Sequence, residues 1–98
     1  GRGGASATIG KLTLLRVHDV GTKFGPPDDQ LDVEVVIRLD SEPGRSFGFQ
    51  LRNDEHGEAN DGMLALLREA FDLDRRVRVE SIRTGCASGR IFRVILET

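Results

Sequence analysis

The sequence predicts a mainly β domain with one helix, arranged as a small five-stranded barrel. Five short segments mix apolar and polar residues as half-buried strands do, whereas residues 62–73 repeat their apolar side chains at helical spacing. The elements follow in the order of three strands, one helix and two strands, within only 98 residues. We therefore expect a single domain over residues 9–98, preceded by a flexible, glycine-rich remnant or linker at residues 1–8.

The first half of the chain predicts three strands. Residues 11–21 crowd their apolar side chains too closely for clean alternation, which indicates a β-bulge or a strand that is apolar on both faces. The loop that follows is marked by the consecutive prolines Pro26 and Pro27. Residues 31–40 then alternate, and residues 47–52 resume the alternation after a turn, so the two should form a hairpin. The pattern places Val33, Val35, Ile37 and Leu39 on one face and Glu34, Arg38 and Asp40 on the other.

Residues 53–61 are polar and acidic around a central glycine, which predicts an exposed loop. Asp61 is then expected to cap the first free amides of the helix at 62–73. The apolar residues of that helix cover about half of its circumference. This face consists of Met63, Leu64, Leu66, Leu67, Ala70, Phe71 and Leu73.

The C-terminal stretch from Arg75 to Thr98 predicts two strands joined by a Gly/Ser turn. In the last strand, Ile91 and Ile95 are out of phase with Phe92 and Val94, so both of its faces should be buried. The expected core is held by Leu12, Val33, Val35, Ile37, Phe47, Phe49, Leu67, Phe71, Val79, Phe92 and Val94.

Charge is unevenly divided along the chain, although the formal net charge is only −2. Up to Asp74 there are 8 basic and 14 acidic residues, and from Arg75 onward there are 6 basic and 2 acidic ones, so −6 stands against +4. The total argues against strong nonspecific binding of nucleic acid. No apolar run approaches the roughly 20 residues of a membrane span, so membrane insertion is not expected.

The element order is that of the OB-fold, and residues 62–98 resemble the pentameric, cell-binding B subunits of bacterial toxins, the Shiga toxin B subunit above all. The resemblance rests on the leucine-rich helix, the glycine-rich turn that carries Cys86, and the final apolar strand. The opening "IGKLTLLRV" is similar to the first strand of that family. The resemblance implies a homo-oligomer, most naturally a pentamer, which presents a surface to a glycan or a partner protein.

Two departures from that family limit what the resemblance implies. Cys86 is the only cysteine, so the disulfide of the family's equivalent turn is absent. The chain has no tryptophan or tyrosine, whose rings commonly stack on sugars, and its five aromatic residues are phenylalanines. No named residue is therefore assigned to a glycan.

Two groups of residues are the candidate binding surfaces. The candidate oligomer interface consists of Ile91, Ile95, Met63 and Leu64. The candidate anionic-ligand patch consists of Arg76, Arg78, Arg83, Arg90 and Arg93. The first interpretation of the chain is a non-catalytic homo-oligomeric binding module. The alternatives are an OB-fold accessory domain that binds nucleic acid weakly through the arginine hairpin, and a purely structural domain of a larger protein.

Catalytic, metal and cofactor sites are not predicted. His18 and Asp19 are adjacent strand residues that point to opposite faces, which does not suit an acid–base pair. His56 lies among the carboxylates of the acidic loop 53–61, but without the spacing of a calcium-binding loop. Phosphate-binding glycine loops, zinc motifs and nucleophile triads are missing, and one cysteine leaves the cellular compartment open.

Overall fold

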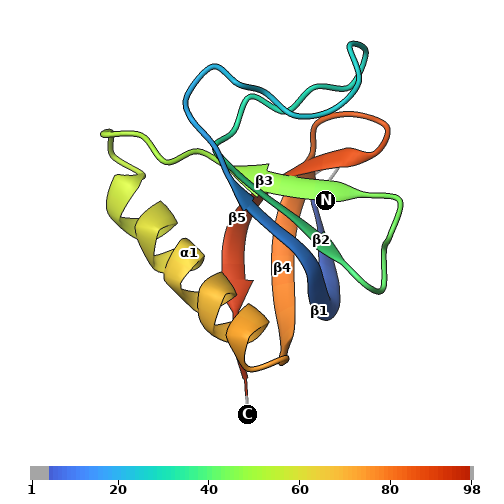
Figure 1. The fold of residues 1–98 in the computed structure, drawn as a ribbon, viewed down its shortest axis with the longest axis vertical. Coiled ribbons are helices and arrows are strands. Elements are labelled where there is room, and N and C mark those ends of the chain that lie inside the picture. Colours follow the sequence, from blue (N-terminus) through green and yellow to red (C-terminus); the bar gives the residue numbers. More distant parts are fainter. Residues whose placement is uncertain (1–4, 98) are drawn as a thin grey trace.

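The computed structural model describes residues 5–97, which form a closed barrel of five strands with one helix inserted between the third and fourth strands (Figure 1). The strands are β1 (Ala5–Val17), β2 (Val35–Leu39), β3 (Ser46–Phe49), β4 (Arg76–Arg83) and β5 (Ser88–Ile95), and the helix is α1 (Gly57–Asp72). The strand order around the barrel is β1-β2-β3-β5-β4, antiparallel except for the β3–β5 pair. The predicted fold class, an OB-fold-like barrel, is confirmed.

The long β1 strand closes the barrel because it pairs with two neighbours. Its first half, Ala5–Lys11, pairs with β4, and its second half, Leu12–Val17, pairs with β2. The predicted bulge is present, since the register with β2 shifts between Leu12 and Leu14. A Cβ on Gly10 would lie 2.6 Å from the Asp40 carboxylate, so a larger residue there would have to displace the Asp40 side chain.

The expected linker at residues 1–8 is wrong for Ala5–Thr8, because these residues belong to β1 and pair with β4. The remaining residues of that predicted linker, 1–4, lie outside the described residues. The small side chains of Ala5–Thr8 show no apolar alternation in the sequence. These residues form a strand because they pair with β4.

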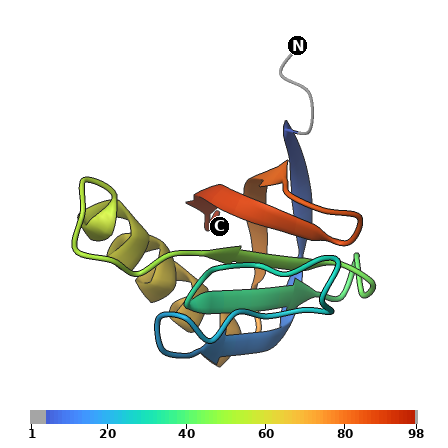
Figure 2. The ribbon, with the colours of Figure 1, turned by 90° about the horizontal axis from the view of Figure 1, so that it is seen from above.

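The main core fills the barrel and is closed at one end by α1, whose residues Met63, Leu67 and Ala70 are buried. A second, smaller cluster lies outside the barrel wall, where loop 18–34 folds back on β2. Figure 2, seen from above, shows this loop running alongside β2. The second cluster consists of Leu31, Val33 and Val36, with Leu14 and Phe24 packed against it.

The helix begins earlier than predicted, at Gly57 instead of Gly62, so the second half of the expected loop 53–61 is helical. Asp61 therefore lies inside the helix and does not cap it. The first turn is fixed by one contact to the preceding segment and one local contact: the Asn60 side chain donates to the Gln50 carbonyl at 2.6 Å, and the Asp54 carboxylate accepts the His56 N–H at 2.9 Å. Gly57 and Gly62 lower the helix propensity of this segment, so the sequence pattern did not indicate that the helix begins here.

Three side chains differ from their predicted burial. Glu34 was expected on a solvent face and is only 3% exposed, because it pairs with Arg52. Phe71 and Phe92 were expected in the core and are 45% and 46% exposed. For Phe92 the cause is a register shift, in which Glu80 pairs with Arg93 and Ser81 with Ile91. Phe92 is thus the extra residue of a bulge, and Ile91 and Val94 both turn inward.

Candidate binding surfaces

The C-terminal hairpin presents four of the five candidate arginines on one outer face. Val77, Val79 and Ser81 of β4 are buried, so Arg76 and Arg78, which alternate with them, point outward. Across the β4–β5 ladder, Arg93 pairs with Glu80, Arg90 with Ile82, and Ile95 with Arg78, which places these side chains on the same face. Arg83 does not share it, because it pairs with Gly89 on the opposite face, at the exposed end of β4.

The charge of this hairpin face is partly neutralised by Glu80. Its carboxylate accepts a hydrogen bond from Arg78 Nε at 3.0 Å and another from Arg93 Nη1. The hydrogen bond from Arg78 is the largest cause that lowers the pKa of Glu80 below its usual value, and the charges of both arginines add to it. Arg90 bonds instead to the Gln50 side chain, at 3.3 Å. The predicted anionic patch therefore holds less free positive charge than the sequence suggested.

Apolar side chains are exposed on the same face. Ile9 of β1 pairs with Arg78, which pairs in turn with Ile95, so the three form one row across β1, β4 and β5. Ile9 is 53% exposed, and a shallow depression of about 370 Å³ lies around this row. Phe92, three residues before Ile95 in β5, is also exposed. This mixture of isoleucine, phenylalanine and arginine is typical of protein-binding surfaces.

The four residues of the candidate oligomer interface are not equally accessible. Ile91 is 4% exposed and Met63 9% exposed, and both belong to the core of the single chain. Both side chains are therefore largely covered by their own chain, although they line part of the groove beside β5. Leu64 and Ile95 are half-buried, and Leu64 packs at the margin of the core. Of the predicted set, Ile95 is the residue placed at an outward-facing position of the hairpin.

A groove of about 380 Å³ lies between α1 and β5, beside Ile91 and Phe92. It exists because β3 pairs with β5 only from Ser88 to Arg90, so β5 beyond Arg90 has β4 as its only strand partner in the part of the chain that the structure describes. Figure 1 shows α1 running alongside this part of β5. The groove is lined by Phe49, His56, Ala59, Asn60, Met63, Ile82, Arg90, Ile91 and Phe92.

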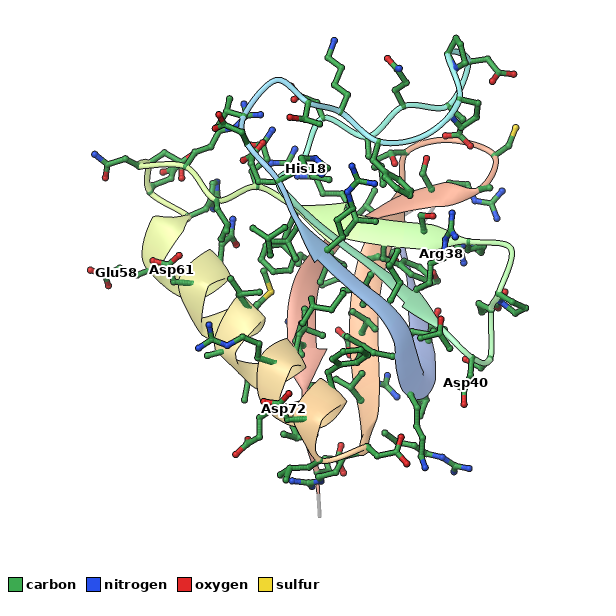
Figure 3. The ribbon with its side chains drawn as sticks, in the orientation of Figure 1. His18, Arg38, Asp40, Glu58, Asp61 and Asp72 are labelled. Atoms are coloured by element: carbon green, nitrogen blue, oxygen red, sulfur yellow. The ribbon has the colours of Figure 1, made fainter. Side chains whose placement is uncertain are left out.

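A second group of arginines, which sequence patterns did not single out, surrounds Phe24 beside β2. The guanidinium carbons of Arg16 and Arg38 lie 5.4 Å and 5.5 Å from the centroid of the Phe24 ring. Figure 3 shows Arg38 on the outer side of the barrel. The only sequence signal was the outward position of Arg38 in β2. Nothing in the sequence predicted that loop 18–34 would carry Phe24 onto this face.

The acidic residues of loop 18–34 hold neighbouring segments together. The Asp29 carboxylate accepts hydrogen bonds from the Ala87 N–H at 2.8 Å and from the Ser88 hydroxyl. The hydrogen bond from Ser88 is the main cause that lowers the pKa of Asp29, and the Ala87 N–H adds to it. This contact ties loop 18–34 to loop 84–87, which lie side by side in Figure 1.

Arg52, in the segment after β3, forms a second connection, to the chain just before β2. It donates to both oxygens of Glu34, at 3.2 and 3.0 Å, and to Asp32 at 3.0 Å. The hydrogen bond to Glu34 is the largest cause that raises the pKa of Arg52. Glu34 also accepts the Leu51 N–H at 2.9 Å, so its buried charge is fully paired. We interpret this cluster as structural.

The histidines and the cysteine are held apart from one another. His18 Nε2 lies 2.7 Å from the Val33 carbonyl, which fixes the ring against the chain before β2, and His56 lies 3.4 Å from Glu55. Glu58, Asp61 and Asp72 are spread along α1 (Figure 3). Within residues 5–97 no three His, Cys, Asp or Glu side chains come close enough to hold a metal ion. Cys86 is exposed in loop 84–87.

No helix in the described part of the chain is long and apolar enough to cross a membrane. The chain matches no protein-family profile, and comparisons with curated proteins and with solved structures give no significant match. The resemblance to toxin B subunits therefore stays a prediction.

Proposed function

We propose that this chain is a non-catalytic binding module that assembles with copies of itself, with an open edge of β1 from one subunit lying in the groove beside β5 of the next. The proposal is carried by one observation: two strand segments of the closed barrel each keep an edge without a strand partner in the described residues. They are Ala5–Thr8 of β1 and Ile91–Ile95 of β5. Unpaired strand edges are templates for pairing with another chain.

The open edge of β1 can be identified from its hydrogen bonds. Lys11 N–H donates to the Asp40 carboxylate at 3.0 Å, and the Ile9 carbonyl accepts from the Ser41 hydroxyl at 2.7 Å, both on the side away from β4. Backbone groups in a strand alternate sides, so Ala5 and Ala7 direct their N–H and C=O groups to that same side. On that side no strand among residues 5–97 pairs with them, because pairing with β2 begins only at Leu12.

Size supports β1 as the occupant of the groove. Ala5–Thr8 has the sequence Ala-Ser-Ala-Thr, and such small side chains suit a groove of about 380 Å³ between a helix and a strand. Contact of one edge with a different edge is head-to-tail, and it closes into a ring when the rotation per subunit divides a full turn. The resemblance to toxin B subunits implies five subunits.

The alternative interpretation, nucleic-acid binding through the C-terminal hairpin, has less support. Glu80 engages Arg78 and Arg93, so two of the four arginines on that face are already paired with a carboxylate. Phe92 is the one exposed aromatic side chain of the described hairpin, and single strands are usually bound by several stacking rings.

The test is the molar mass in solution of the wild type and of Ala7→Pro. Proline removes the N–H that Ala7 directs to the open edge but leaves the β4 ladder intact, because the bonds to β4 come from the neighbouring residues. We expect a wild-type mass near five subunits and a folded, monomeric Ala7→Pro by light scattering and circular dichroism. Ala7→Thr, which keeps the N–H, should assemble as the wild type does. A monomeric wild type, or a folded Ala7→Pro with unchanged mass, would contradict the proposal.

A further inference from the structure

A pocket of about 170 Å³ lies where three loops of the barrel meet, beside Phe24 and away from the open strand edges. Loop 18–34 contributes Phe24 and Asp29, β2 contributes Arg38, and β3 and loop 84–87 contribute Ser46 and Ala87. The pocket is preformed, because the hydrogen bonds of Asp29 to Ala87 and Ser88 join loop 18–34 to loop 84–87 and the start of β5. Gly25, next to Phe24, has a φ of +113°, which glycine adopts readily, and it turns loop 18–34 along the side of the pocket.

The pocket carries positive charge that no carboxylate in residues 5–97 neutralises by an ion pair. Arg38 donates from Nε to the Ser46 hydroxyl at 3.2 Å, which leaves both of its terminal nitrogens for a ligand. Arg16 lies on the same Phe24 ring, and neither arginine forms an ion pair among the described residues, unlike Arg52 and Arg93. Phe24 thus contacts both guanidinium groups without cancelling their charge, and of the two only Arg38 lines the pocket in the described residues.

Asp29 is the one acidic residue that lines this pocket. Its Oδ2 accepts from the Ala87 N–H and its Oδ1 from the Ser88 hydroxyl, so both oxygens are engaged by loop 84–87 and the first residue of β5. Arg38 is the basic residue of the described lining, and Arg16, which contacts the Phe24 ring outside the lining, adds a second positive charge nearby. The hydroxyl of Ser46 completes a set of donors directed at a small oxyanion.

We infer that this pocket binds the phosphoryl group of a small ligand, with Arg38 as the principal contact and Arg16 as a second positive charge. A guanidinium offers two parallel N–H donors that match a pair of phosphate oxygens, and a hydroxyl can reach a third. The pocket has room for such a group but not for a long polymer. The inference does not depend on self-association, since it uses none of the residues of the open strand edges.

The test is a set of NMR titrations of the wild-type chain at low ionic strength with four probes. These are inorganic phosphate, a nucleoside 5′-monophosphate, the same nucleoside without phosphate, and a short single-stranded oligonucleotide. Phosphate and the monophosphate should shift the amide signals of Arg38, Ser46 and Ser88 with a dissociation constant on the order of 1 mM. The bare nucleoside should leave these signals unchanged.

Variants then assign the contact. Arg38→Gln should weaken monophosphate binding by about tenfold or more, since charge-assisted hydrogen bonds are lost. Arg76→Gln is the matched control, because Arg76 is also exposed and without a salt bridge in the described residues but lies on the hairpin face. Equal losses in both variants, equal shifts with the bare nucleoside, or no shifts with phosphate would overturn the site. An oligonucleotide that bound far more tightly than the monophosphate would overturn its assignment to a small ligand.

Discussion

At the scale of single residues, the loops are held in place by hydrogen bonds between residues far apart in the sequence and not by a local sequence motif. Asp29 is separated by 58 residues from Ala87, yet its carboxylate joins the loops that carry them. The space beside Gly85 shows how closely these loops meet, because a Cβ there would clash with the Asp29 carboxylate. In the sequence, Asp29 was one of several acidic residues in a loop that looked merely polar.

Replacing Asp29 by alanine should lower the thermal midpoint by a few degrees near pH 7. The pKa of Asp29 is lowered from its usual value of 3.8, so its contribution is complete above that pH and is lost as the pH falls below it. The difference between wild type and Asp29→Ala should therefore shrink in thermal melts at about pH 3. Asp28→Ala is the control, since Asp28 is exposed, and it should match the wild type. A difference independent of pH would contradict the role of the charged carboxylate.

At the scale of secondary structure, α1 has a narrower buried face than its composition suggested. Met63, Leu67 and Ala70 enter the core, whereas Phe71 and Leu73 are 45% and 59% exposed. Apolar periodicity showed correctly that the segment is a helix with one core-facing side. It overestimated the width of that side, because the barrel end covers only the residues that point directly into it.

Two substitutions in α1 measure this difference. Leu67→Ala should lower the free energy of unfolding by about 2 to 5 kcal/mol, because the side chain is fully buried and a cavity remains. Phe71→Ala should cost much less, although phenylalanine is larger, since nearly half of its surface is already in water. Urea denaturation measures both values. Similar losses in the two variants would mean that Phe71 is covered, for example by a neighbouring subunit.

At the scale of the whole molecule, the row of Ile9, Arg78 and Ile95 lies on the outer face of the sheet, with Ile9 exposed and Ile95 half-buried. When an open edge pairs with another chain, the sheet continues into the neighbour, and outward side chains near that edge acquire new contacts. Ile95 lies within the open segment of β5. Its side chain should therefore pack against the β1 strand of the next subunit.

Ile95→Lys should consequently break the assembly and leave a folded monomer, since the lysine charge would be buried in the contact. Val20→Lys is the matched control, because Val20 is 58% exposed in loop 18–34, outside both open segments, and it should leave the mass unchanged. Light scattering with circular dichroism separates dissociation from unfolding. An unchanged mass for Ile95→Lys would refute this interface, while a loss of assembly in both variants would show that the effect is not specific.

The sequence by itself determined the fold class, because the alternation in residues 33–39 and 47–49, the helical spacing after Gly62 and the order of the elements follow from local patterns. The crowding of Leu12, Leu14, Leu15 and Val17 also predicted either a bulge or a strand apolar on both faces, and the structure has the bulge. Only the tertiary structure decided the burial of Glu34, the exposure of Phe92 and the early start of α1. Each of these depends on a contact outside the element itself. Glu34 pairs with Arg52, Phe92 lies at the shifted register with β4, and the first turn of α1 is held by the Gln50 carbonyl.

The candidate sites divide in the same way. Composition drew attention to the arginines of the C-terminal hairpin, but Glu80 pairs with two of them across and along the strands. The Phe24 pocket joins loop 18–34 with β2, β3 and loop 84–87, and no spacing in the sequence connects these segments. Local patterns record which face of a strand is buried. The contacts that shape a pocket arise between loops whose approach is set by barrel closure, and only the folded chain brings them together.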